Sequence, residues 1–377
     1  MSKPQFNTIA NLKQAFIITA IGLLLAVTSF HRILDALNFS KSINSSDFQM
    51  SDVYNNVAEN RSVAILNGEI VIVALDGCNR GDIANLLINL NTLSPKVMGL
   101  DVLFFNRYEG DEYLIQAIRS CSNLILPIAI DEDEGDVIDS YFYNEIPEKK
   151  LGCINLDAYA SNQCVRTFRP IVQTSNFSLN AFGVQAAAIA DPEAYKNLLS
   201  RDKISEVISY PSVEFQTLFA KDILENPLSF KDQISGKIIL MGDTENTGDF
   251  HLTPVSNGMP GIMIHAHIID TIISGKYISH IPMWSKWIIA FAVCFVFMLV
   301  KLFVRDISYK LGLLLMRVIQ MSCLYLFFAI GCKMYIDHMT YIDFAPTLLM
   351  ITLALFVYDI WIGTTTLIKI ILRKERI

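Results

Sequence analysis

Six polar residues could together form a binding site, because each lies near the end of a predicted strand. They are Asp76, Arg80, Asp101, Asp243, Asp249 and His251. Several carboxylates and a histidine can bind a cation, and with an arginine they can bind a small polar ligand. An aspartate that follows a strand also often caps the next helix, and Asp76 and Asp243 fit that alternative. The sequence leaves both interpretations open.

The motifs of the common enzyme classes are missing from the sequence. It contains no Gly-x-Ser-x-Gly, no Gly-x-x-x-x-Gly-Lys-Ser/Thr and no His-Glu-x-x-His. The glycine-flanked stretch 242–249 lacks the lysine and the Ser/Thr of a phosphate-binding loop. We therefore expect a protein that is not an enzyme, with no catalytic residue and no cofactor.

A metal site is not predicted either. His265 and His267 are two positions apart, so on a helix they point to different faces, whereas ligand pairs prefer spacings of three or four. We expect these histidines to pack or cap near the start of a helix. The seven cysteines show no zinc-site spacing.

The segment 236–278 carries the clearest structural signal. A short apolar run, 238–241, predicts a buried strand, and a long polar loop follows it. A helix is predicted to begin after Pro260 and Gly261 and to end at Gly275. In open α/β sheets ligands bind beyond the carboxyl ends of the strands, so this loop is where we expect a site.

Preceding segments alternate between strand and helix patterns. Strands are predicted at 70–75, 97–105 and 124–130, and helices at 80–93 and 111–118. Further along, helices are predicted at 178–190, 192–200 and 214–219, with a strand at 204–210. This alternation predicts an α/β sandwich with a mainly parallel sheet.

Hydrophobic residues make up 52% of the 377 residues, which is too many for one ordinary soluble domain. The excess lies in four runs, each near the roughly 20 residues that a helix needs to cross a bilayer. We predict one N-terminal and three C-terminal transmembrane helices, at 14–30, 284–304, 311–332 and 344–363. The first is interpreted as a retained anchor rather than a cleaved signal peptide.

Charge predicts the orientation of these helices. Residues 31–282 contain 18 Lys and Arg against 32 Asp and Glu, a net charge of −14, while the remainder contains 12 against 5, a net charge of +7. Short flanks rich in Lys and Arg stay cytoplasmic. The N-terminus 1–13 and the basic tail 364–377 are therefore predicted inside, and domain 31–282 outside. Its acidity also argues against nucleic-acid binding.

Two of the four cysteines in this domain could form a disulfide. Cys153 and Cys164 flank a predicted hairpin at 152–172 and could face each other across its strands. Buried thiols are the alternative.

Three stretches are similar to a known family. They are Ile70–Asp76 with Arg80; the strand Ser94–Phe104, with the pattern Pro-Lys-x-x-Gly-x-Asp-x-x-Phe; and Gly236–Gly242 with Asp249, Thr253-Pro254, Met259-Pro260-Gly261, His265-Ala266 and Ser274-Gly275. Over about residues 50–280 the chain resembles the type-two CHASE domain, an extracytoplasmic sensor associated with cyclases and histidine kinases. The resemblance implies a sensor in a bacterial inner membrane. Members of this family usually continue after the last helix into an output domain, whereas this sequence ends at Ile377, so we expect the output to be a separate protein.

Our main hypothesis is a membrane sensory protein whose outer domain detects an unknown small ligand or an envelope state. It would signal through its helices in the lipid bilayer to a separate cytoplasmic or membrane output protein. The alternative is a structural or assembly subunit of an envelope complex that binds a protein. A third hypothesis is an envelope hydrolase that uses the carboxylates. The sequence leaves the oligomeric state open, a homodimer included.

Overall fold

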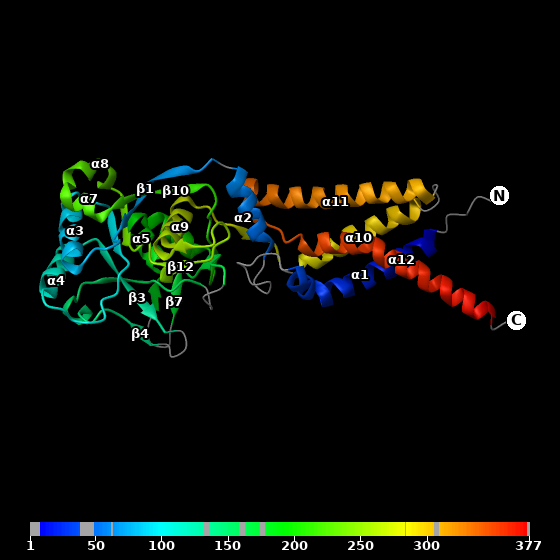
Figure 1. Ribbon diagram of the computed structural model, residues 1–377, viewed down its shortest axis with the longest axis horizontal. Helices are drawn as coiled ribbons and strands as arrows, with labels where there is room; N and C mark the ends of the chain where they lie inside the picture. Colours follow the sequence, from blue (N-terminus) through cyan, green and yellow to red (C-terminus); the bar gives the residue numbers. More distant parts are fainter. Residues whose placement is uncertain are drawn as a thin grey trace. The chain divides into compact units, whose positions relative to one another are not determined.

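The computed structural model (Figure 1) describes residues 8–37, 49–61, 63–131, 136–157, 163–173, 178–282, 284–304 and 309–374. The chain divides into two compact units. One comprises residues 1–54 and 279–377, and the other comprises residues 55–278.

A mainly parallel sheet forms the centre of the unit 55–278. Its strand order is β10-β1-β11-β2-β3-β4, and β5 also pairs with β3. All these pairs are parallel except β3 with β4. The strands are β1 (Ile65–Ala74), β2 (Val97–Leu100), β3 (Leu124–Ile130), β4 (Val137–Ile138), β5 (Lys150–Cys153), β10 (Val213–Phe219) and β11 (Ile238–Gly242).

Helices cover both faces of this sheet, because alternate residues of its central strands point to opposite sides. Val71 and Val73 of β1 pack in one core with helices α3 (Arg80–Thr92), α4 (Asp111–Ser120) and α7 (Ala220–Glu225). Ile70 and Ile72 pack in the other core with α5 (Phe182–Ala190), α6 (Pro192–Ser200) and α9 (Gly261–Ser274). Figure 1 shows α3, α4 and α7 grouped apart from α5 and α9. The predicted α/β sandwich is confirmed.

Short elements complete this unit. They are α8 (Lys231–Ile234), β6 (Thr167–Phe168), β7 (Ile171–Gln173), β8 (Ser178–Asn180), β9 (Glu206–Val207), β12 (Phe250–His251) and β13 (Met259–Pro260), with 3₁₀ turns at Tyr143–Glu145, Pro227–Phe230 and Thr247–Asp249. β12 and β13 pair antiparallel just before α9.

Three local predictions are wrong. The helix predicted at 178–190 begins only at Phe182, because residues 178–180 form β8 and pair with β7. Residues 214–219 were expected to be helical, but they form the edge strand β10, which runs parallel to β1. The hairpin at 152–172 does not form, because β5 pairs with β3 and β6 pairs with β9. The backbone of Cys153 instead forms an isolated β-bridge with Ala181, and that of Cys164 forms one with Leu252. Both side chains are buried thiols, and no disulfide joins them in the described part of the chain.

The other unit contains four helices that are long and apolar enough to cross a membrane, as predicted. They are α1 (Thr8–Leu37), α10 (Ser285–Val304), α11 (Tyr309–His338) and α12 (Ala345–Lys374). Buried side chains of all four, among them Ile18, Cys294, Met316 and Met350, share one apolar core. This arrangement is expected of helices that pack against one another within a bilayer.

Short polar and aromatic contacts close one end of this unit. β14 (Ser279–His280) pairs with β15 (Thr340–Tyr341), and Lys286 Nζ lies 3.0 Å from Asp343 Oδ2. The fully buried Tyr54 ring of α2 (Met50–Arg61) packs 5.7 Å from Tyr335 and 6.1 Å from Tyr341, between ring centroids.

Candidate functional site

Three of the six predicted residues share one edge of the sheet. Strands β1, β11 and β2 are parallel neighbours, so their carboxyl ends meet there and bring Asp76, Asp243 and Asp101 to the same side. The backbone N–H of Asp101 donates to the carbonyl of Met241 at 2.8 Å and extends the pairing beyond the end of β2. The predicted position beyond the strand ends is therefore where these side chains lie.

Asp76 and Asp243 organise the turn that follows β11. The Asp76 carboxylate accepts hydrogen bonds from the Thr244 hydroxyl at 2.6 Å, the Thr244 N–H at 3.0 Å and the Glu245 N–H at 2.9 Å. Asp243 Oδ1 accepts from the N–H groups of Glu245 and Asn246, each at 3.1 Å. Each carboxylate thus binds backbone N–H groups of a turn rather than capping the next helix, because Asn79 is the N-cap of α3 and Asn246 is the N-cap of the 3₁₀ turn Thr247–Asp249.

These two carboxyl groups also share a hydrogen bond. Burial raises the pKa of Asp76, but hydrogen bonds from Asp243, Thr244 and Glu245 outweigh it and lower that pKa to about 2. The same bond to Asp76, together with burial, raises the pKa of Asp243. Of the two carboxyl groups, Asp243 therefore binds a proton more readily than Asp76.

A second group forms around Asp249. Its Oδ1 lies 3.3 Å from Nε2 of His251, and its Oδ2 accepts a hydrogen bond at 3.3 Å from the N–H of Gly261, the first residue of α9. Burial raises the pKa of the neighbouring Asp101 to about 7, Asp249 adds to the rise and His251 opposes it. Asp101, Asp249 and His251 are thus brought within electrostatic reach of one another.

His265 belongs to the same environment, although it was not among the predicted ligands. It is buried in the second turn of α9, and its ring packs 5.1 Å from that of Phe182. Burial lowers the pKa of His265 to about 4, with Asp249 opposing and His251 adding to the decrease. The Nδ1 atom of His265 has no hydrogen-bond partner among the described residues. The sequence predicted that His265 packs near the start of this helix, because it lies one turn after the predicted helix start.

Arg80 does not join the aspartates of the strand ends. It forms an ion pair with Asp111, and its guanidinium carbon lies 4.4 Å from the ring centroid of Tyr108 and 5.1 Å from that of Phe104. The Asp111 carboxylate also accepts from the Tyr141 hydroxyl at 2.6 Å and from the Tyr108 N–H at 2.8 Å. Arg80 therefore links the start of α3 to the start of α4.

The six predicted residues thus separate into three groups, which are Asp76 with Asp243, Asp101 with Asp249 and His251, and Arg80 with Asp111. No set of three or more His, Cys, Asp and Glu side chains among the described residues is arranged to hold a metal ion. Asp101, Asp249 and His251 instead form a partly buried, ionisable cluster, and Asp249 contacts the first turn of α9.

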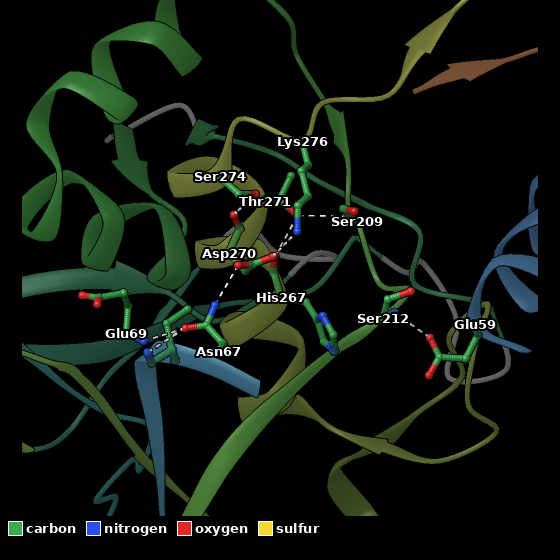
Figure 2. A network of polar contacts seen from close by, with 11 residues as sticks. Glu59, Asn67, Glu69, Ser209, Ser212, His267, Asp270, Thr271, Ser274 and Lys276 are labelled. Carbon is green, nitrogen blue, oxygen red and sulfur yellow. Dashed lines mark hydrogen bonds and ion pairs between the residues drawn. The ribbon is translucent and has the colours of Figure 1, made fainter. Parts of the chain in front are cut away.

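The opposite end of α9 is tied to the sheet by the polar network in Figure 2. Asn67 donates a hydrogen bond of 2.7 Å to the buried Asp270, and Lys276 Nζ lies 3.7 Å from the other Asp270 oxygen. The Thr271 hydroxyl donates to the carbonyl of His267 and accepts from the N–H of Ser209 at 2.9 Å.

Asn67 itself shapes β1 where the strand pairing with β10 is irregular. Its Oδ1 accepts from the N–H groups of Glu69 at 2.8 Å and Ile70 at 3.0 Å. The buried His267 ring packs at 5.0 Å from Tyr210 and 4.9 Å from Phe215. Polar and aromatic contacts therefore fix the last two turns of α9 against β1 and the segment 209–215.

The layout of the described chain can be compared with known proteins. Searches of curated proteins and of solved structures each gave no match. The profile of the CHASE2 domain matches residues 77–302, which include Asp101, Asp243, Asp249, helix α9 and most of α10. CHASE2 domains are sensory extracellular domains, and the match extends over more than half of the chain. The chain is therefore a membrane protein that belongs to the CHASE2 domain family.

Proposed function

We propose that this protein is a membrane sensor in which the Asp101–Asp249–His251 cluster responds to a ligand or to an envelope state. The change passes along α9 into the membrane helices. A separate protein receives the signal, and the chain itself catalyses no reaction. Asp76 and Asp243 are left out of this cluster, because their carboxylates are engaged in ordering the turn 243–246.

The observation that carries the proposal is the position of α9. The first N–H of this helix binds Asp249, its second turn contains His265, and residues 275–284 join its end to α10. A ligand that draws the Asp249 carboxylate away from Gly261 would release this first turn. Such a ligand shifts the protein only as far as it binds one arrangement of α9 better than the other.

The close approach at Gly261 supports this coupling. A Cβ atom at Gly261 would lie 3.0 Å from both oxygens of Asp249, which is closer than ordinary van der Waals contact. Glycine therefore allows the carboxylate to sit directly on the helix N-terminus, where the partial positive charge of the helix stabilises it.

The coupling is tested with the full chain in lipid nanodiscs. Periplasmic metabolites, inorganic ions and cell-wall fragments are screened by thermal unfolding, and any hit is followed by amide hydrogen exchange. We expect at least one compound to raise the melting temperature and change exchange in residues 261–274, and Asp249→Asn to weaken both effects. The exposed Asp232→Asn on α8 is the matched control and should change neither. A chain indifferent to the whole set, with a stoichiometric protein partner recovered from detergent, supports the assembly-subunit alternative instead.

We further propose a bacterial inner-membrane topology with both termini cytoplasmic and residues 55–278 in the periplasm. The support is the charge difference, −14 for residues 31–282 against +7 for the remainder. Alkaline phosphatase fused after residue 150 should be active, and green fluorescent protein at the same position should stay dark. The reverse pattern would reject this topology.

A further inference from the structure

A pocket lies at the opposite, amino edge of the sheet. Its volume is about 680 Å³, within the range of small-molecule sites. One wall is the end of α4 and the start of β3, and the other is the segment 145–150 that leads into β5. Since β3 and β5 are parallel and both begin here, this pocket is separate from the aspartates at the carboxyl ends.

Three cations line this pocket, and main-chain carbonyl groups hold each of them in place. Arg119 donates to the carbonyl of Glu145, and Lys150 Nζ donates to the carbonyl of Ser122 at 2.6 Å. Lys149 Nζ donates to the carbonyls of Tyr143 at 2.8 Å and Ile146 at 3.3 Å. An ammonium has three N–H donors and a guanidinium five, so donors remain on all three side chains.

Carbonyl groups position these cations without neutralising them. None of the three forms an ion pair with a carboxylate in the described part of the chain. The carboxylates of Glu145 and Glu148 also line the pocket, so its three cations exceed its carboxylates by one charge; Arg119 and both glutamates are exposed, whereas Lys149 and Lys150 are half-buried. The pocket thus differs in sign from its surroundings, because residues 31–282 as a whole have a net charge of −14.

The rest of the lining is apolar. Leu124, Leu126 and Ile146 are buried side chains that face the pocket, next to the buried thiol of Cys121. An anion alone would leave this surface in contact with water. An anion attached to an apolar body would also cover the parts of these side chains that are open to the pocket.

We propose that this pocket binds a small organic anion, a carboxylate or phosphate carried on an apolar body, through Arg119, Lys149 and Lys150. The anionic group takes the N–H donors that the carbonyl groups leave available, and the apolar body lies against Leu124 and Leu126. The inference concerns binding and stands independently of whether α9 carries a signal.

The probes are phenylacetate and phenyl phosphate, with phenylacetamide as the neutral isostere of the first and inorganic phosphate as an anion without an apolar body. Each is titrated against the full chain in lipid nanodiscs by calorimetry and thermal unfolding. We expect at least one phenyl anion to bind saturably and to raise the melting temperature. Phenylacetamide and inorganic phosphate should each bind at least about tenfold more weakly, because each lacks one of the two contributions.

Variants then assign the site. Lys149→Gln and Lys150→Gln should each weaken phenyl-anion binding by about tenfold, as expected for the loss of a charge-assisted hydrogen bond. Lys196→Gln removes the same charge from the exposed face of α6 and should leave binding unchanged. Lys149→Arg keeps the charge and should restore most of the affinity.

Because the lysine variants also remove contacts to the backbone, Ser122→Asp gives an independent test. Ser122 is exposed at the pocket, so a carboxylate there should abolish anion binding while the unliganded melting temperature stays close to that of the wild type. The proposal is overturned if neither phenyl anion binds or if phenylacetamide binds as tightly as phenylacetate. It is also overturned if Lys196→Gln loses as much affinity as the pocket variants, or if Ser122→Asp still binds.

Discussion

Asp101→Asn should stabilise the domain formed by residues 55–278 at high pH and leave it unchanged at low pH. Burial raises the pKa of Asp101 from the ordinary 3.8 to about 7, because the ionised carboxylate would lose hydration in the folded protein and would be repelled by Asp249. A carboxyl whose pKa is raised on folding contributes stability below pH 3.8. That contribution is lost as the pH rises towards 7, since the folded state binds the proton more tightly. Asparagine resembles the protonated acid in shape and cannot ionise.

The size of the effect follows from that shift. A rise from 3.8 to about 7 corresponds to roughly 4 kcal/mol of stability lost between pH 4 and pH 8. Asp101 is half-buried as a residue, and the solvent near it screens its charge, so we expect about 2–4 kcal/mol. For a domain of this size that corresponds to a rise in melting temperature of roughly 5–15 °C at pH 8.

Thermal unfolding of the full chain in nanodiscs, from pH 4 to pH 8, measures this difference between wild type and variant. The comparison is needed because burial lowers the pKa of His265 to about 4, which destabilises both proteins as the pH falls. Asp232→Asn on the exposed surface of α8 is the control and should give parallel curves. An Asp101→Asn protein that gains no stability at pH 8, or gains equally at pH 4, would falsify the buried, proton-binding environment described for Asp101.

Two further changes probe how α9 is held. Asn67→Ala removes the 2.7 Å hydrogen bond to the buried Asp270 and should cost about 1–3 kcal/mol, measured as a lower melting temperature with faster amide exchange at the end of α9. Gly183→Ala places a Cβ 2.9 Å from the carbonyl oxygen of His265, where α5 crosses α9, and should cost about 1–3 kcal/mol by overpacking. An unchanged melting temperature in either variant would contradict the contact concerned.

Sequence periodicity was sufficient for the elements that are buried along their whole length. Strand β3 has the predicted bounds, and the continuous apolar run that indicated it is buried at six of its seven positions. Helix α9 begins at Gly261, one residue earlier than predicted, and the predicted Gly275 ends it in a left-handed conformation with φ of 65°. In both cases a local pattern and the tertiary environment favour the same structure.

Strand β10 shows where local pattern fails. Its sequence Val-Glu-Phe-Gln-Thr-Leu-Phe is only partly buried, because it lies at the edge of the sheet, so the alternation expected of a strand is weak. Its conformation is decided by pairing with β1, a segment about 150 positions earlier in the chain. Seven residues of ambiguous pattern do not reveal a partner at that separation.

The candidate site shows the same limit for side chains. Strand order could be anticipated well enough to bring Asp76, Asp101 and Asp243 to one edge, because the backbone alone determines where strands end. Arg80 was grouped with them because it follows β1 closely. Its long side chain instead pairs with Asp111 on α4, and that choice depends on the packing of two helices.

The two edges of the sheet differ in charge, and this difference limits what each can bind. At the carboxyl edge burial raises the pKa of Asp101 and Asp249 adds to that rise, while the hydrogen bond to Asp76 raises the pKa of Asp243, so an anion bound there would face carboxyl groups. At the amino edge Lys149 and Lys150 retain N–H donors that carbonyl groups orient. An organic anion should therefore select the amino edge, and a cation or a basic protein segment the carboxyl edge. Because their preferred ligands have opposite charge, the two sites can be distinguished in a single screen.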